Sequence, residues 1–185
     1  MLEASAVIFD MDGVLIDSEP LYMEQERRSF ARHGVTLNKN QLSRFVGTTQ
    51  HHMWSAIKNE YALTESLDSL MTQHHQQLVH MMSSVPLSPM AGSQKLLDVL
   101  NKAGVPCAVA SSSPRELVNI ILHRTGLRTY FNNIVCGDDV KLSKPNPEIF
   151  LLAAKQLGIL PEECLVIEDS CHGVTAAKAA TMFCI

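Results

Sequence analysis

Three short apolar segments of the chain each end abruptly in polar residues, and this pattern constrains the fold more than any other feature. Residues 6–9, 106–110 and 164–167 have the continuous apolar character of buried strands. Helical patterns separate them, and strands that alternate with helices predict parallel βα units. Because the carboxyl ends of parallel strands share one edge of the sheet, we expect the polar residues that follow to converge there.

The first of these segments ends in two carboxylates. Asp10 and Asp12 stand two positions apart, and Gly13 follows them. Residues i and i+2 of an extended chain point the same way, so the two carboxylates repel each other unless a proton or a cation separates them. Hard oxygen ligands with room for water suit Mg²⁺. Taken alone, the stretch could equally be a strand-to-turn junction, with aspartate as the turn former and glycine supplying a positive φ.

A helical stretch without a good strand interrupts the βα alternation after the first strand. The predicted organisation is therefore a core of residues 1–17 and 86–185 with an inserted helical domain of residues 18–85. Within the insert, we expect Thr64 to cap a helix that runs towards Met82. The insert also contains histidines, which are expected on the surface because adjacent pairs diverge on a helix; these are His51, His52, His74, His75 and His80.

Composition excludes several classes of function. The 185 residues carry a net charge of −4 and no basic run, so nothing favours nucleic acid as a partner. No apolar stretch approaches the length of a membrane span, and the N-terminus has no basic region typical of a signal peptide. The five cysteines are odd in number and scattered, as in a reduced cytosolic protein without a disulfide framework or zinc site. We expect a cytoplasmic monomer without a membrane partner.

The polar clusters at the three strand ends predict a phosphoryl-transfer site. Carboxylates from two strands, Asp10 and Asp169 with Glu168 as a further candidate, can hold Mg²⁺ together with a backbone carbonyl. A carboxylate can act as a nucleophile through an aspartyl phosphate, and a second carboxylate nearby can move the proton. In this interpretation Asp10 is the nucleophile and Asp12 is the general acid and base.

The remaining polar residues predict the phosphate contacts. Ser111 offers a hydroxyl, and the amides of Ser112 and Ser113 precede a helix N-terminus, which suits phosphate oxygens. Lys144 can neutralise Asp10 and a phosphoryl group together. Each feature alone has a plainer explanation, since Ser111 could be a turn serine, Lys144 a solvated lysine and residues 168–170 a helix cap. Their convergence at one sheet edge favours the site.

In four segments the chain resembles the haloacid dehalogenase superfamily of hydrolases, in its β-phosphoglucomutase-like subgroup. The matching motifs are residues 9–14, 108–111, 143–145 and 167–170. The resemblance implies a Rossmann-like core with a helical cap, Mg²⁺ as cofactor, and phosphoryl transfer on a small phosphorylated metabolite. It also implies that Asp10, the backbone carbonyl of Asp12 and Asp169 bind the metal.

The chain departs from the pattern of this family in two places. It ends at Ile185, partway into the next strand, so the C-terminal part of the core is expected to be truncated. Family mutases carry an arginine shortly after the glycine that here is Gly47, and a histidine just after the first motif. Here the corresponding segments offer Gln50 and Tyr22, neither of which is a cation.

These departures favour hydrolysis over phosphate migration. We expect a Mg²⁺-dependent phosphatase that acts on a sugar phosphate through an aspartyl phosphate, with Gln50 as a candidate substrate contact in the cap. The alternatives are a phosphomutase of the β-phosphoglucomutase type and, from a different class, a catalytically silent binding module. The sequence leaves open which phosphorylated compound is the substrate.

Overall fold

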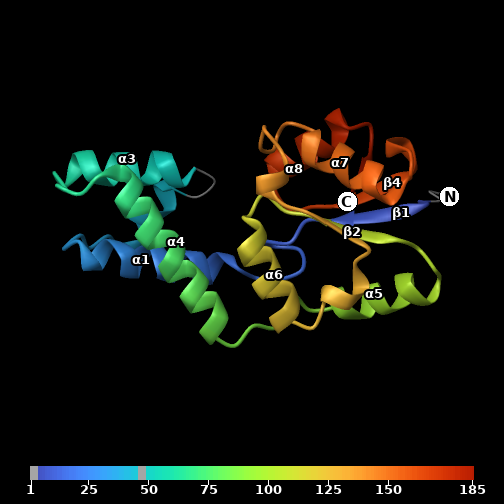
Figure 1. Ribbon diagram of the computed structural model, residues 1–185, viewed down its shortest axis with the longest axis horizontal. Coiled ribbons are helices and arrows are strands. Elements are labelled where there is room, and N and C mark those ends of the chain that lie inside the picture. The colour runs from blue at the N-terminus through green and yellow to red at the C-terminus, as the bar shows by residue number, and fades with distance from the viewer. Residues whose placement is uncertain (1–3, 46–48) are drawn as a thin grey trace. The chain divides into compact units, whose positions relative to one another are not determined.

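The computed structural model describes residues 4–45 and 49–185 (Figure 1). The chain divides into two compact units. The core unit comprises the described residues up to Ser18 together with Pro86–Ile185, and the helical unit comprises Glu19–Val85. The chain therefore passes between the units twice, once after Ser18 and once after Val85.

A parallel five-stranded sheet forms the centre of the core unit, and it confirms the predicted α/β class. The strand order is β3-β2-β1-β4-β5. The first strand pairs with β2 on one side and β4 on the other, with Phe9 opposite both Val109 and Ile167. This register brings the ends of three strands level. The bounds are β1 Ala6–Phe9, β2 Cys107–Ala110, β3 Asn133–Val135, β4 Cys164–Ile167 and β5 Phe183–Cys184.

Helices cover both faces of this sheet, so its three central strands, β2, β1 and β4, are apolar throughout. Helices α7 and α8 lie on one face of the sheet, and α5 and α6 lie on the other (Figure 1). Side chains alternate between the faces: Ile8 packs in the cluster that contains residues of α7 and α8, whereas Phe9 packs in the cluster that contains residues of α5 and α6. Ligands in such sheets bind outside the carboxyl ends of the strands, where neighbouring connections leave to opposite faces. The helices are α5 Ser93–Lys102, α6 Arg115–Arg124, α7 Glu148–Leu157 and α8 Cys171–Ala179, with short 3₁₀ turns η2 Arg128–Tyr130, η3 Gly137–Asp139 and η4 Pro161–Glu163.

The helical unit has a small apolar core of its own, in which Phe30, Trp54, Ile57 and Leu70 are fully buried. Its elements are α1 Glu19–Arg32, α2 Lys39–Leu42, η1 Ser43–Phe45, α3 Gln50–Glu60 and α4 Leu67–Ser84. Gly47, the glycine compared with that of the family mutases, lies outside the described residues, and α3 begins at Gln50 after Thr49.

Two predictions for the helical unit are wrong. The cap of α4 is Ser66, whose Oγ accepts the N–H of Ser69 at 3.2 Å, and not Thr64. His74 is buried rather than on the surface, because it falls on the stripe of α4 that packs inward, and its Nδ1 lies 3.2 Å from Ser29 Oγ. Burial lowers the pKa of His74 to about 4, with a smaller contribution from the neighbouring His75.

All five cysteines are free thiols. Burial raises the pKa of Cys107, Cys136 and Cys164 to about 11.

Within the described part of the chain, none of the helices has the length and apolar character needed to cross a membrane.

Candidate active site

The site is built where β1 and β4 end side by side. Asp10 follows β1 directly, and its N–H donates to the carbonyl of Ile167 at 2.9 Å, so pairing with β4 continues to the last residue of that strand. Glu168 is the next residue after β4. Both residues are buried, at 7% and 8% exposure. The parallel register alone therefore places two carboxylates next to each other at the edge of the sheet.

Lys144 lies between these two carboxylates. Its Nζ donates to Asp10 Oδ1 at 2.6 Å and to Glu168 Oε1 at 2.7 Å, and its side chain is only 7% exposed. The lysine precedes a cis peptide bond to Pro145 at the turn that leads into α7. The structure thus brings together the lysine and the carboxylates that the sequence predicted to converge.

Burial and charge shift the ionisation of the site strongly. Burial raises the pKa of Asp10 to about 7; Lys144 opposes this rise, and the carboxylates of Asp12 and Glu168 add to it. Burial works against the charge on Lys144, yet its two carboxylate partners leave its pKa above the ordinary value. Burial, followed by repulsion from Glu168, raises the pKa of Asp169. The site therefore holds more negative charge than one lysine compensates.

The donor set fits a divalent cation of the Mg²⁺ type. Asp10, Glu168 and Asp169 each offer a carboxylate oxygen, and these atoms lie within 4.8 Å of one another. Gly13 makes room for them: it has φ +82°, and a Cβ there would stand 2.1 Å from Asp169 Oδ2. Carboxylate oxygens in a site with excess negative charge are what Mg²⁺ prefers.

Glu168 is held more tightly than the two aspartates. Its Oε1 accepts from Lys144, and its Oε2 accepts from both the N–H of Ser170 at 2.7 Å and the hydroxyl of that serine at 3.0 Å. A Cβ on Gly173 would lie 1.6 Å from Glu168 Oε1, so the first turn of α8 leaves space for this carboxylate. Its predicted role as a metal ligand stays a prediction, whereas its contact with Lys144 is present.

The carboxylate of Asp12 does not belong to the group formed by Asp10, Glu168 and Asp169. Its Oδ1 accepts the hydroxyl of Ser18 at 2.6 Å, and its Oδ2 accepts the hydroxyl of Ser113 at 2.9 Å. Two different loops therefore fix its direction. The sequence pattern gave Ser18 no place in the site and Ser113 only a backbone amide, so both hydroxyl contacts were missed.

The serine loop after β2 lies at the same edge of the sheet. Ser111 is fully buried, and its Oγ accepts the N–H of Ser113 at 3.1 Å. Ser112 is exposed. The predicted phosphate contacts of all three serines stay predictions. Gln50 is the first residue of α3 in the helical unit, directly after the cap residue Thr49, and its predicted substrate contact likewise stays a prediction.

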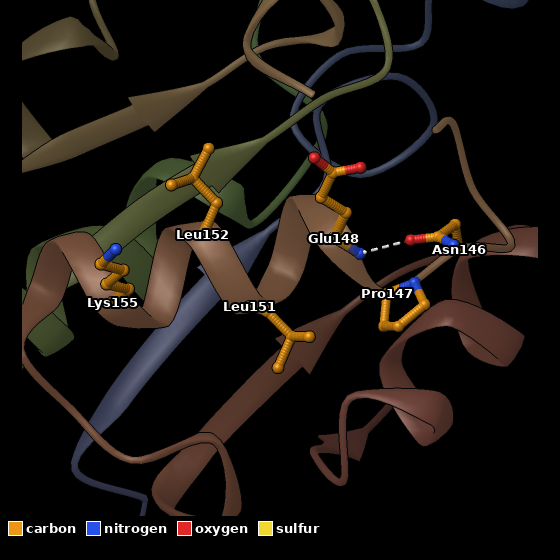
Figure 2. A pocket seen from close by; sticks show the side chains of 6 residues that line it. All are labelled: Asn146, Pro147, Glu148, Leu151, Leu152 and Lys155. Carbon is orange, nitrogen blue, oxygen red and sulfur yellow. Dashed lines mark hydrogen bonds between the residues drawn. The ribbon is translucent and has the colours of Figure 1, made fainter. Parts of the chain in front are cut away.

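A surface pocket of about 380 Å³ lies elsewhere, along α7 (Figure 2). At its edge the N–H of Glu148 donates to Asn146 Oδ1 at 3.0 Å, which orders the start of the helix. The lining does not include the carboxylate cluster, so the chemistry belongs to the strand ends and not to this pocket. The lining residues are Asn146, Pro147, Glu148, Leu151, Leu152 and Lys155.

Comparison with known proteins agrees with this geometry. Residues 7–185 match the family model described as haloacid dehalogenase-like hydrolase. The phosphorylated carbohydrates phosphatase of Thermotoga maritima is 35% identical, with 95% of this chain and 81% of that protein covered. The fructose-1-phosphate phosphatase YqaB of Escherichia coli is 30% identical over 96% of this chain and 93% of its own length.

A solved structure shows the same likeness. The crystal structure of a putative β-phosphoglucomutase from Thermotoga maritima superposes with a TM-score of 0.82 at 35% identity, covering 96% of this chain and 82% of that one. The chain therefore belongs to the haloacid dehalogenase-like hydrolase family. Its relatives place its activity among the phosphoric monoester hydrolases.

Proposed function

We propose that the chain is a Mg²⁺-dependent phosphatase that hydrolyses a small sugar phosphate through an aspartyl phosphate on Asp10. The observation that carries this proposal is the buried lysine between two carboxylates at the ends of β1 and β4. Relatives named for phosphorylated carbohydrates, fructose 1-phosphate and hexitol phosphatase activity support the substrate class.

Asp10 is the proposed nucleophile because its surroundings suit attack on phosphorus. Its carboxylate is buried, and Lys144 holds one of its oxygens at 2.6 Å. That contact fixes the carboxylate and favours its charged form. In the first step a carboxylate oxygen of Asp10 forms a bond to phosphorus, and the bond from phosphorus to the sugar oxygen breaks. Lys144 also offsets charge on the transferred phosphoryl group.

Asp12 is the proposed general acid and base. The leaving sugar oxygen needs a proton, which Asp12 donates as the first bond breaks. In the second step the same carboxylate takes a proton from the water that attacks the phosphorus and releases phosphate from Asp10. The hydroxyls of Ser18 and Ser113 hold the two carboxylate oxygens of Asp12 in place, which suits a residue that must present a proton to the leaving group.

Asp10, Asp169 and the backbone carbonyl of Asp12 are the proposed metal ligands, with Glu168 as a further candidate. A bound Mg²⁺ supplies positive charge that stabilises the phosphoryl oxygens. Gly13 leaves the space that the carboxylate of Asp169 needs among these proposed ligands.

The helical unit is the proposed cap. It is inserted through two connections, after Ser18 and before Pro86. Rotation about those connections would close the site and exclude water during phosphoryl transfer. Gln50 is the proposed cap contact to the substrate. Crystals with and without a phosphate analogue test the rotation: identical placement of the two units in both would contradict it.

The phosphomutase alternative is favoured by one observation, the likeness to a structure titled as a putative β-phosphoglucomutase. A mutase must hold a second phosphate while its intermediate reorients, which calls for a cation in the cap. Gln50 and Tyr22 supply none. We therefore expect inorganic phosphate as the product rather than an isomeric sugar phosphate.

Phosphate release in the presence of Mg²⁺ tests the proposed function. The wild type is expected to hydrolyse p-nitrophenyl phosphate and hexose phosphates, and EDTA should abolish the activity. Asp10→Asn should be inactive because an amide is not a nucleophile, whereas the exposed control Asp68→Asn should match the wild type. Full activity of Asp10→Asn would refute the role of that residue, and a folded wild type without any activity would favour a silent binding module.

A further inference from the structure

Hydrogen bonds join the loops after β1, β2 and β3 along the edge of the sheet. Ser113, in the loop after β2, donates its hydroxyl to Asp12 Oδ2 at 2.9 Å. The carbonyl of Ser113 accepts the N–H of Gly137, in the loop after β3, at 3.1 Å. The N–H of Ser113 donates to Ser111 Oγ at 3.1 Å. The side chain that reaches Asp12 is therefore attached to backbone that is fixed on both sides.

Gly137 sets the spacing between two of these loops. A Cβ at this position would lie 2.4 Å from the carbonyl oxygen of Ser112, which is closer than real Cβ contacts allow. The obstacle is backbone and not a flexible side chain. Any larger residue must therefore push the serine loop away from η3 and move Ser113 with it.

Arg115 ties the same loops to the start of α6. The cap position of this helix is Pro114, which offers no side-chain acceptor, and Asp138 instead accepts the N–H of Arg115 at 2.7 Å. The guanidinium of Arg115 pairs with Asp139, whose carboxylate also accepts the N–H of Cys136 at 2.8 Å. These contacts link η3 to the serine loop and the helix that follows it.

We propose that Ser113 is a positioning residue for Asp12, and that Gly137 and the Asp138–Arg115 contact hold Ser113 in place. This inference rests on the proposed phosphatase function. A general acid must present its proton towards the leaving oxygen, and a carboxylate at a strand end can rotate unless both oxygens are bonded. Ser18 holds one oxygen and Ser113 the other. Removal of the Ser113 hydroxyl takes away the hydrogen bond to Asp12 Oδ2.

The alternative is that the Ser113 hydroxyl binds a phosphate oxygen directly. The two roles differ in how they depend on the leaving group. A sugar alkoxide needs a proton from Asp12, whereas p-nitrophenolate leaves without one. A phosphate contact would serve both substrates equally. The decisive quantity is therefore kcat/KM for a hexose phosphate compared with kcat/KM for p-nitrophenyl phosphate.

The experiment compares Ser113→Ala with Ser113→Thr, which keeps a hydroxyl, and with Ser43→Ala as a matched control. Ser43 is exposed, and its hydroxyl donates to the carbonyl of Asn40 within the same turn of the helical unit. We expect Ser113→Ala to lose roughly 10- to 100-fold in kcat/KM on the hexose phosphate, the worth of a hydrogen bond to a charged group. On p-nitrophenyl phosphate the loss should stay below about threefold. The threonine variant should recover most of the activity, and Ser43→Ala should match the wild type.

A double variant that combines Ser113→Ala with Asp12→Asn completes the test. If Ser113 acts through Asp12, its removal costs nothing further once Asp12 is an amide. Gly137→Ala should reproduce the leaving-group pattern of Ser113→Ala. Equal losses on both substrates, or additive losses in the double variant, would overturn the inference while leaving the phosphatase function intact. An inactive wild type would instead refute the function itself.

Discussion

Replacement of Lys144 by methionine tests the charge balance at the ends of β1 and β4. The lysine makes two short contacts to buried carboxylates, Asp10 at 2.6 Å and Glu168 at 2.7 Å, with its side chain 7% exposed. Methionine keeps most of the side-chain volume and removes the charge. The loss of folding stability should therefore come from the broken ion pairs and not from a cavity.

The size of the stability loss is set by the buried carboxylates that remain without their lysine partner. Removal of one partner of a buried ion pair costs about 3–5 kcal/mol, because a buried charge remains uncompensated. Proton uptake limits this cost, since the pKa of Asp10 is already about 7 and loses the lysine that lowers it. A carboxyl group whose pKa is raised in the folded state contributes stability that is fully present below its ordinary pKa of 3.8 and is lost as the pH rises through the folded pKa. The deficit of Lys144→Met should therefore be larger at pH 8 than at pH 6.

Urea unfolding of metal-free protein, followed by circular dichroism, measures this deficit. Lys141→Met is the matched control, because Lys141 is exposed, and it should change the free energy of unfolding by less than about 0.5 kcal/mol. Added Mg²⁺ should recover part of the loss in Lys144→Met by neutralising the same carboxylates. A Lys144 variant as stable as the Lys141 variant at both pH values would refute the calculation.

Three further predictions follow from single contacts. Gly13→Ala should weaken Mg²⁺ binding by at least about tenfold in titration calorimetry, since its Cβ would collide with Asp169; Gly104→Ala, with φ +71° and open space, shares the backbone strain and should keep normal affinity. His74 is held neutral with its pKa lowered to about 4, so its contribution to folding stability is present above about pH 6.5 and is lost as the pH falls. Unfolding followed by the fluorescence of Trp54, the one tryptophan, should show a loss of about 2 kcal/mol in the free energy of unfolding between pH 7.5 and 5. An unchanged pH dependence in His74→Leu would contradict this. Hexose 1-phosphate should yield inorganic phosphate, and faster appearance of the 6-phosphate by enzymatic assay would identify a mutase.

The strands and the residues at their ends could be predicted because the signals are local. Residues 6–9 and 164–167 are continuous apolar runs that stop at charged residues, and both strands have these bounds in the structure. Helix α7 likewise begins directly after Pro147 and ends directly before Gly158, which are local signals of helix ends. Parallel pairing then brings Asp10 and Glu168 together without further information.

The directions of side chains could not be predicted, because they depend on partners distant in sequence. Ser113 bonds to Asp12 across 101 positions. The tight hold on Glu168 depends on the missing side chain of Gly173 in the next helix, which a pattern of single residues does not reveal. His74 was misplaced for a related reason, since a polar residue on the inward stripe of α4 resembles a surface residue until its packing partners are known.

Mass spectrometry of the phosphorylated intermediate tests the central proposal most directly. Asp12→Asn with p-nitrophenyl phosphate is the best case, because the leaving group needs no proton while breakdown of the intermediate lacks its base. Acid-quenched protein should then carry one phosphoryl group on the peptide that contains Asp10, and the Asp10→Asn variant should carry none. Phosphate on any other residue, or turnover by wild type with no phosphoryl group ever found on Asp10, would contradict the proposed mechanism.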